Sequence, residues 1–208
     1  MNDLLRIAVL ASGRGSNLNS IIQATQTGKL SAQVALVVSN NSKAGALEIA
    51  RQARISALHL SVEQFESEAL FDRALLDALK KYRVEVIALA GYLKKISPAI
   101  VKAFKHRIVN IHPALLPSFG GKGMYGVKVH QAVLDYGCKV SGVTVHLVDE
   151  EYDAGIPVLQ RCLPVKPDDT AETLAARVLE QEHQIYVEAL QLFAEHRIVV
   201  RGRKLTLK

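Results

Sequence analysis

The sequence predicts an α/β protein, with an open, mostly parallel, twisted sheet that carries helices on both faces. Short apolar runs alternate with helical patterns along the chain, which is typical of strand–helix–strand units around a parallel sheet. The run at residues 84–90 is continuously apolar, as expected for a strand buried on both faces. The 208 residues suit one hydrophobic core, so we expect a single domain over residues 1–208.

Strands and helices are predicted to alternate over the first half of the chain. Strands are predicted at residues 6–10, 34–38 and 56–60. Helices are predicted after residue 17, at residues 44–53 and at residues 61–82. Leu18, Ile21 and Ile22 share one face of the first helix, and the Ser61 to Gln64 stretch reads as a capping box that opens the third.

The second half is predicted to end in a long helix and a hairpin. Strands are expected at residues 84–90, 108–112, 139–148 and 156–160, with an acidic turn at residues 149–155. Helices are expected at residues 129–136 and at residues 169–196, and a hairpin at residues 197–207 around Gly202. The glycine-rich stretch at residues 118–127 is either a mobile lid or a plain connector.

Composition limits the classes of partner and compartment. Hydrophobic residues make up 49% of the chain and charged residues 22%, a balance that excludes a disordered protein. The apolar runs are far shorter than a membrane span, and no cationic leader opens the chain, so we expect a cytoplasmic protein with no membrane partner. Cys138 and Cys162 lack a CxxC spacing and are expected to be reduced thiols.

A net charge of +6 favours anionic partners, but the basic residues are scattered. The one basic cluster, at residues 201–204, reads as a solvated tail rather than as an RNA contact. We therefore expect small anionic ligands and no nucleic acid.

A glycine loop between the first strand and the first helix outlines a phosphate site. Gly13 and Gly15 permit a tight turn, while Ser16 and Asn17 bring N–H groups to the positive end of the helix. A dinucleotide fingerprint would need glycine at Leu18, and no stretch reads as a P-loop, so a single phosphomonoester fits better. The alternative is a helix start that uses glycine only for its turn.

Two polar residues interrupt the apolar strand at residues 108–112. Asn110 and His112 are two positions apart, so both side chains project from the same face of the strand, which Pro113 ends. An amide donor and a titratable imidazole in one small volume suit the stabilisation of an oxyanion and the transfer of a proton. For the pair in isolation, a structural strand end is the competing interpretation.

The phosphate loop, this pair and the turn that contains Asp153 are all expected on one rim of the sheet. At this point the sequence closely resembles the phosphoribosylglycinamide formyltransferase family of purine biosynthesis. The matching segments run in the family's order over nearly the whole chain, at residues 11–18, 89–93, 109–117, 142–146, 153–160 and 181–186. The resemblance implies the Rossmann-like formyltransferase fold and transfer of a formyl group from 10-formyltetrahydrofolate to glycinamide ribonucleotide.

By that resemblance, one end of the site binds the ribonucleotide and the other binds the folate. The ribonucleotide phosphate would be held by Gly15, Ser16 and Asn17, with Glu182 near its ribose or amine. The folate pocket would be lined by Leu93, Lys94, Lys95, Ile96 and Asn110. We expect these small molecules to be the substrates of a monomer or homodimer.

Asn110, His112 and Asp153 match the family's catalytic trio. Asn110 and an imidazolium at His112 would stabilise the oxyanion, and the carboxylate of Asp153 is expected to raise the pKa of His112 so that it acts as an acid near pH 7. His146 is either a packed strand residue or part of the site. A metal site at His112, His130, His146 and Asp153 is an alternative, but these residues lack a compact spacing such as HExxH, so no metal is expected.

Two other functions are compatible with parts of this pattern. A formyltransferase or formyltetrahydrofolate hydrolase with another acceptor, either methionyl-tRNA or water, would normally carry an extra domain, for which 208 residues leave little room. A non-catalytic phosphate-binding module would have no need of an imidazole beside a carboxylate.

Overall fold

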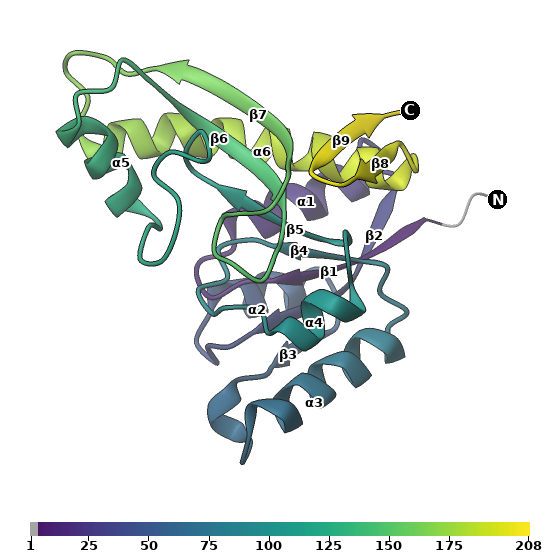
Figure 1. Ribbon diagram of the computed structural model, residues 1–208. Helices are drawn as coiled ribbons and strands as arrows, with labels where there is room; N and C mark the ends of the chain where they lie inside the picture. Colours follow the sequence, from purple (N-terminus) through teal and green to yellow (C-terminus); the bar gives the residue numbers. More distant parts are fainter. Residues whose placement is uncertain (1–3) are drawn as a thin grey trace.

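The computed structural model describes residues 4–208 and has a seven-stranded sheet at its centre, in the order β3-β2-β1-β4-β5-β6-β7 (Figure 1). Its strands are β1 (Leu5–Leu10), β2 (Ala32–Ser39), β3 (Ala57–His59), β4 (Val86–Leu89), β5 (Ile108–His112), β6 (Val140–Leu147) and β7 (Pro157–Pro164). The strands from β3 to β5 pair in parallel, whereas β6 and β7 are antiparallel to their neighbours. The prediction of a mostly parallel sheet is confirmed.

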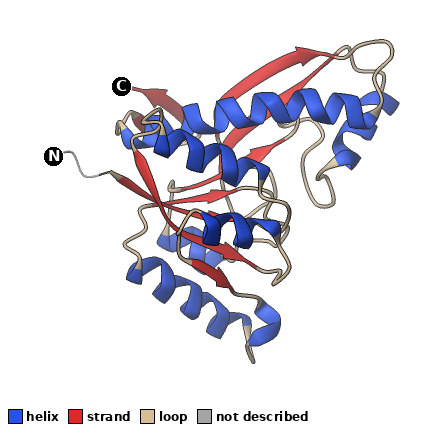
Figure 2. Ribbon diagram, turned by 180° about the vertical axis from the view of Figure 1, so that it is seen from behind, coloured by secondary structure: helices blue, strands red, loops and turns tan. Residues whose placement is uncertain are grey.

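Helices cover both faces of the sheet, as predicted (Figure 2). They are α1 (Ser16–Gln26), α2 (Gly45–Gln52), α3 (Glu68–Lys81), α4 (Pro98–Ala103), α5 (Val127–Asp135) and α6 (Ala171–Ala194). One core cluster joins α1, α2 and α6 to one face of the sheet, and a second joins α3 and α4 to the other. Strand residues alternate between the two clusters, with Ile7 and Val9 in the first and Ala8 and Leu10 in the second, because successive side chains point to opposite faces.

The predicted helix at residues 61–82 is wrong at its beginning. The Ser61 capping box is present, but it closes only a short 3-10 turn, η1 (Val62–Gln64). The α-helix begins six residues later, where the Ser67 hydroxyl accepts a hydrogen bond from the N–H of Leu70 and provides a second N-cap. The prediction also left out α4, which Ser97 caps and Pro98 starts.

The C-terminal half follows the prediction with shifted boundaries. Strand β7 continues four residues beyond the expected end at Gln160, and Thr170, not Asp169, is the N-cap of α6. The expected hairpin consists of β8 (Ile198–Arg201) and β9 (Lys204–Leu207).

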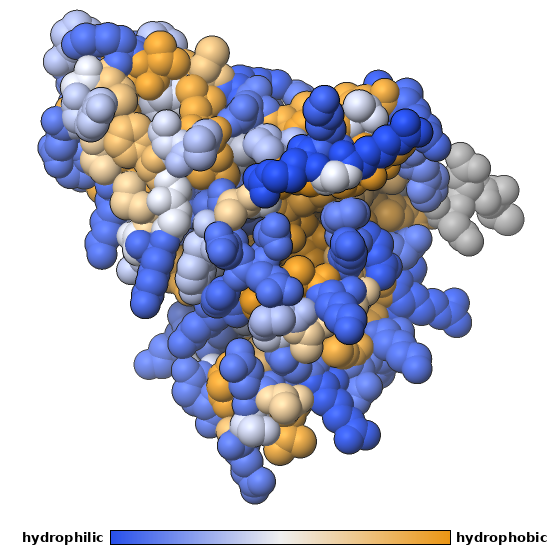
Figure 3. Space-filling model, viewed as in Figure 1, coloured by the Kyte–Doolittle hydropathy of each residue, from blue (hydrophilic) through white to orange (hydrophobic). Residues whose placement is uncertain are grey.

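Apolar side chains gather at the surface over α5 and the adjoining strands, where Val127 and Val140 are exposed (Figure 3).

Tyr186 fastens α6 to the middle of the sheet. The side chain is fully buried, and its hydroxyl group lies 2.9 Å from the carbonyl oxygen of Leu89 on β4 and 3.1 Å from that of Val109 on β5. Burial raises the pKa of Tyr186 well above its usual value, so the hydroxyl keeps the proton that it donates. The two strands that lead into the pocket loops are thereby held to one helix.

We expect Tyr186→Phe to lower the free energy of unfolding by about 1–3 kcal/mol, because two buried carbonyl groups lose a donor while the ring still fills its space. Urea denaturation measures the change. Tyr136→Phe is the matched control, since Tyr136 is 82% exposed and should change stability by less than about 0.5 kcal/mol. Equal stability of the two variants would contradict this account of Tyr186.

Candidate active site

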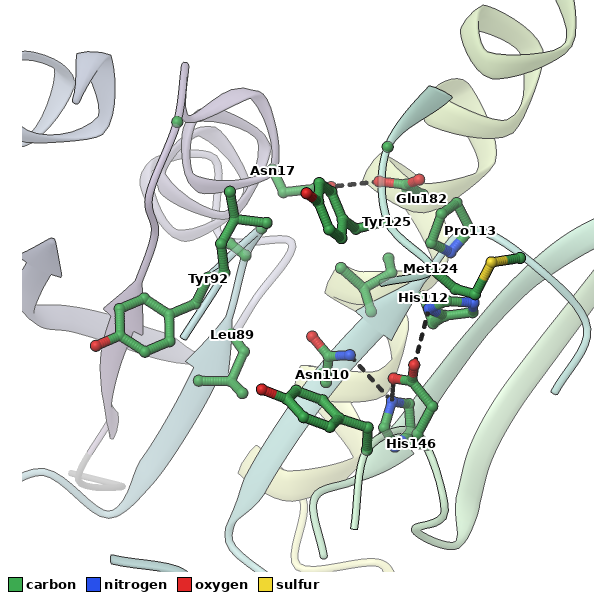
Figure 4. A pocket seen from close by; sticks show the side chains of 18 of the residues that line it. Asn17, Leu89, Tyr92, Asn110, His112, Pro113, Met124, Tyr125, His146 and Glu182 are labelled. Atoms are coloured by element: carbon green, nitrogen blue, oxygen red, sulfur yellow. Dashed lines mark hydrogen bonds and ion pairs between the residues drawn. The ribbon is translucent and has the colours of Figure 1, made fainter. Parts of the chain in front are cut away.

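A pocket of about 730 Å³ opens at the carboxyl ends of β1, β4 and β5 (Figure 4). Loops that follow these strands line it, together with the turn after β6 and one face of α6. The structure brings to this pocket every site residue named from the sequence, namely Gly15, Ser16, Asn17, Leu93, Lys94, Lys95, Ile96, Asn110, His112, Asp153 and Glu182. Segments that are far apart in the chain therefore share one volume.

The glycine loop presents the positive end of α1 to the pocket. Gly15 lies in the left-handed region at φ 86, and a Cβ atom there would approach the Cα atom of Ala46 to 2.9 Å. Glycine is therefore needed both for the turn and for close packing against α2. No described side chain caps the first turn of α1, so the N–H groups at Ser16 and Asn17 remain available to an anion.

Asn17 connects the glycine loop to α6. Its Nδ2 atom donates a hydrogen bond of 2.8 Å to the Oε2 atom of Glu182, and its buried Oδ1 atom has no partner among the described residues. Burial raises the pKa of Glu182, and the hydrogen bond from Asn17 only partly offsets this. This corner of the pocket therefore combines the amide of Asn17 with the carboxyl group of Glu182.

A second loop, at residues 89–97, forms the opposite wall. The buried Ser12 hydroxyl ties this loop to the end of β1, because it accepts a 2.8 Å hydrogen bond from the N–H of Leu93. Lys94 forms a salt bridge of 3.2 Å with Glu63 at the pocket mouth, and the amine of Lys95 lies 5.7 Å from the centre of the Tyr152 ring. Sequence analysis did not identify Ser12, because its partners come from distant loops.

Asp153 lies between two histidines. Its Oδ2 atom is 3.6 Å from the Nδ1 atom of His112 and accepts a 2.8 Å hydrogen bond from the N–H of Gly121, while its Oδ1 atom is 3.5 Å from the Nε2 atom of His146. The other nitrogen of His112, Nε2, donates a 2.8 Å hydrogen bond to the carbonyl oxygen of Phe119. Both nitrogens of His112 therefore face acceptors, which favours a ring that can become doubly protonated.

The structure places His146 in the site, an alternative that the sequence left open. It lies opposite Asn110 in the antiparallel pairing of β5 with β6. Its Nδ1 atom donates a 2.9 Å hydrogen bond to the carbonyl oxygen of Leu147, so in the neutral ring Nε2 is free to accept a hydrogen bond from the amide of Asn110, 3.0 Å away. This contact fixes the direction of the Asn110 amide and leaves its second N–H for a ligand.

The expected rise in the pKa of His112 is wrong. Burial lowers the pKa of this ring, and the Asp153 carboxylate and the Phe119 carbonyl oppose the shift without reversing it. For Asp153, burial raises the pKa, but the two histidines and the N–H of Gly121 outweigh it, so the pKa lies below its usual value. The resting site near neutral pH therefore combines a neutral imidazole at His112 with a carboxylate at Asp153.

His130 on α5, which sequence analysis considered only as a possible metal ligand, is a further pocket residue. Its side chain is 3% exposed, and its Nδ1 atom has no partner within residues 4–208. Burial, together with the nearby His112, lowers the pKa of His130 to about 4. Within residues 4–208, no group of three or more histidine, cysteine or acidic residues has an arrangement suited to a metal ion.

Comparison with known proteins finds similarity to formyl transferases. The family model described as formyl transferase matches residues 5–190. The chain is 47% identical to a chloroplastic phosphoribosylglycinamide formyltransferase from Vigna unguiculata over 94% of its own length, and it spans 63% of that protein. It is 40% identical to the phosphoribosylglycinamide formyltransferase of Haemophilus influenzae, with 93% of this chain and 89% of that protein covered.

A solved structure shows the same fold over the whole molecule. The glycinamide ribonucleotide transformylase 1 of Symbiobacterium toebii superposes with a TM-score of 0.93 at 40% sequence identity, and the match covers 100% of this chain and 95% of that chain. In the part of this chain that the structure describes, no helix is both long and apolar enough to span a membrane.

The low pKa of His130 predicts that the protein loses stability as the pH falls. Between pH 6.5, near the pKa of histidine in an unfolded chain, and the folded value of about 4, the unfolded chain binds a proton that the folded ring does not. The contribution of His130 to the free energy of unfolding is thus fully present above pH 6.5. We expect about 1–2 kcal/mol of this contribution to be lost at pH 5.

Urea denaturation at pH 7.5 and pH 5 measures this loss in the wild type and in His130→Asn. The variant should show a smaller difference between the two pH values, whereas His59→Asn, at an exposed histidine, should keep the wild-type difference. If His130→Asn keeps the wild-type difference in unfolding free energy between the two pH values, the His130 ring is not the cause of the loss of stability.

Proposed function

The chain belongs to the formyl transferase family, and we propose that it transfers the formyl group of 10-formyltetrahydrofolate to the amine of glycinamide ribonucleotide. The single observation that carries this proposal is the arrangement of Asn110, His112 and Asp153 in the pocket that also receives the open end of α1. Relatives of known name and similar length support the choice of acceptor.

The two walls of the pocket suit the two substrates. A phosphate fits the N–H groups of Ser16 and Asn17, since the start of a helix favours negative charge. Glu182 lies beside Asn17, where it would contact the ribose or the amine. On the opposite wall, residues 93–96 would hold the folate, with the basic side chains of Lys94 and Lys95 near its carboxylates.

Attack of the substrate amine on the formyl carbon puts negative charge on the formyl oxygen. The free N–H of Asn110 would stabilise this charge, because His146 already holds the amide in place. A donor that is oriented before the reaction needs no reorganisation when the charge appears.

The attacking nitrogen must lose a proton and the departing folate nitrogen must gain one. His112 is neutral at rest, so it would accept the proton, and Asp153 would stabilise the resulting imidazolium across 3.6 Å. The same ring, or a water that it orders, would then return the proton to the leaving nitrogen. His112 thus acts as a shuttle rather than as an acid that is charged from the start.

Two finer features of the protein are part of the proposal. Cys138 and Cys162 are free, which fits a reducing compartment, and we place the enzyme in the cytoplasm. We infer a monomer or a homodimer, and size-exclusion chromatography with light scattering distinguishes the two.

We expect His112→Ala and Asp153→Asn each to lower kcat by about 100-fold or more, because each removes a partner in proton transfer. Asparagine also tolerates the left-handed backbone of Asp153, at φ 54, so the second variant should remain folded. Steady-state kinetics measures the loss, and Asp168→Asn, an exposed acid outside the pocket, is the control. A near-normal rate in either folded variant would remove that residue from the mechanism.

Ser16→Ala should raise the KM for glycinamide ribonucleotide by about 10-fold and leave kcat close to that of the wild type, because it removes the Ser16 hydroxyl as a donor to the phosphate and leaves the backbone N–H groups in place. Binding of the dephosphorylated substrate should be unaffected. Asn19→Ala, at an exposed position on α1, controls for changes in the helix. Equal losses of affinity for both ligands would show that the loop does not bind phosphate.

The acceptor is tested by a formyl-transfer assay with 10-formyltetrahydrofolate and one acceptor at a time. Glycinamide ribonucleotide should be formylated, whereas initiator methionyl-tRNA and water alone should give no product above background. Faster transfer to either of these would replace the proposed acceptor with the alternative one.

A further inference from the structure

The C-terminal hairpin, β8 and β9, touches the turn that carries Asp153. The Nη2 atom of Arg203 donates a 3.0 Å hydrogen bond to the carbonyl oxygen of Ala154, which directly follows Asp153. This is the only hydrogen bond that joins the described hairpin to the turn at residues 149–155. In Figure 1 the tip of the yellow hairpin points toward the green strand and loop that adjoin this turn.

The backbone of this turn is constrained on both sides of Ala154. Asp153 lies in the left-handed region at φ 54, a conformation that costs a non-glycine residue about 1 kcal/mol. Next to it, Gly155 lies so close to β6 that an added Cβ atom would meet the carbonyl oxygen of Leu147 at 1.6 Å. The carbonyl group of Ala154 lies between these two constrained positions, one residue after Asp153.

The hairpin is itself anchored and can serve as a support. Ile198, Val200 and Leu205 pack against the larger core cluster, so the tip is carried by a packed base. Residues 201–204 were expected to be a solvated tail, and all four are exposed, while the guanidinium group of Arg203 also donates to the carbonyl oxygen of Ala154. The hairpin also lies beyond residue 190, where the match to the family ends.

We propose that Arg203 is a positioning residue, which holds the Ala154 carbonyl and thereby keeps the Asp153 carboxylate between His112 and His146. Arg203 does not touch the substrates and takes no part in proton transfer. This inference rests on the proposed function, because its effect is read in formyl transfer.

Loss of the support should impair turnover more than binding. Asp153 acts on His112 during proton transfer, whereas the groups proposed to hold the ribonucleotide belong to α1 and α6. We expect Arg203→Ala to lower kcat by about 3- to 10-fold and to change the KM for glycinamide ribonucleotide by less than about 2-fold, the size of effect that one displaced contact produces. Arg203→Lys can still donate to the carbonyl group and should recover at least half of the lost rate.

Arg201→Ala is the matched control, because it removes the same charge from the same hairpin and Arg201 makes no hydrogen bond through its side chain to a described residue. It should keep the wild-type kcat. Thermal unfolding of all three variants should occur within about 2 °C of the wild type, since single exposed contacts contribute little to stability.

Three results overturn the inference while the wild type is active. They are an unchanged kcat in Arg203→Ala, equal losses in Arg203→Ala and Arg201→Ala, or a fall in kcat that is matched by a fall in melting temperature and is not recovered by lysine. A wild type that formylates no acceptor would instead refute the proposed function, so the two failures are distinguishable.

Discussion

The carboxylate of Asp153 lies between two histidines on neighbouring strands, with one oxygen 3.6 Å from His112 and the other 3.5 Å from His146. This contact depends on the reversal of strand direction after β5. Because β6 runs antiparallel to β5, His146 lies opposite Asn110 in the register, and the turn after β6 brings Asp153 back to the same edge. If β6 were parallel to β5, a long crossover connection would be needed between the two strands, and β6 would not run back past Asn110 in this register. The antiparallel end of the sheet therefore allows residues from β5, from β6 and from the turn after β6 to meet in one site.

Local patterns in the sequence were sufficient to predict much of this arrangement. The alternation of Asn110 and His112 placed both on one face, and the glycine loop predicted an open helix start, because both depend on neighbours in the chain. Boundaries were less certain where two signals competed, as at Ser61 and Ser67, which are both good N-caps. The Ser61 box is satisfied within one short turn, and only the packing of α3 decides where the longer helix starts.

What the sequence could not predict depends on contacts between distant segments. His146 belongs to the site because its register places it opposite Asn110. Ser12 belongs to it because its hydroxyl is bonded to a loop about eighty residues away in the chain. The direction of the pKa shift of His112 was wrong for a similar reason. Sequence analysis recognised the favourable charge of Asp153 but had no measure of burial, which is the larger effect in the folded protein.

Tyr186 joins β4 and β5 to α6, and Glu182 lies one turn earlier on the same helix. The proposed ribonucleotide side and the proposed oxyanion side of the pocket thus belong to one frame, which consists of α6, β4 and β5. Any induced fit that accompanies ligand binding has to occur in segments outside this frame. Residues 122–126 of the glycine-rich stretch are the natural place, because Gly123 and Gly126 have positive φ and these residues line the pocket without belonging to the sheet. Phe119 and Gly121, by contrast, are held by hydrogen bonds to His112 and Asp153. A change in pocket shape on ligand binding would then come from residues 122–126, while α6, β4 and β5 keep their positions relative to one another.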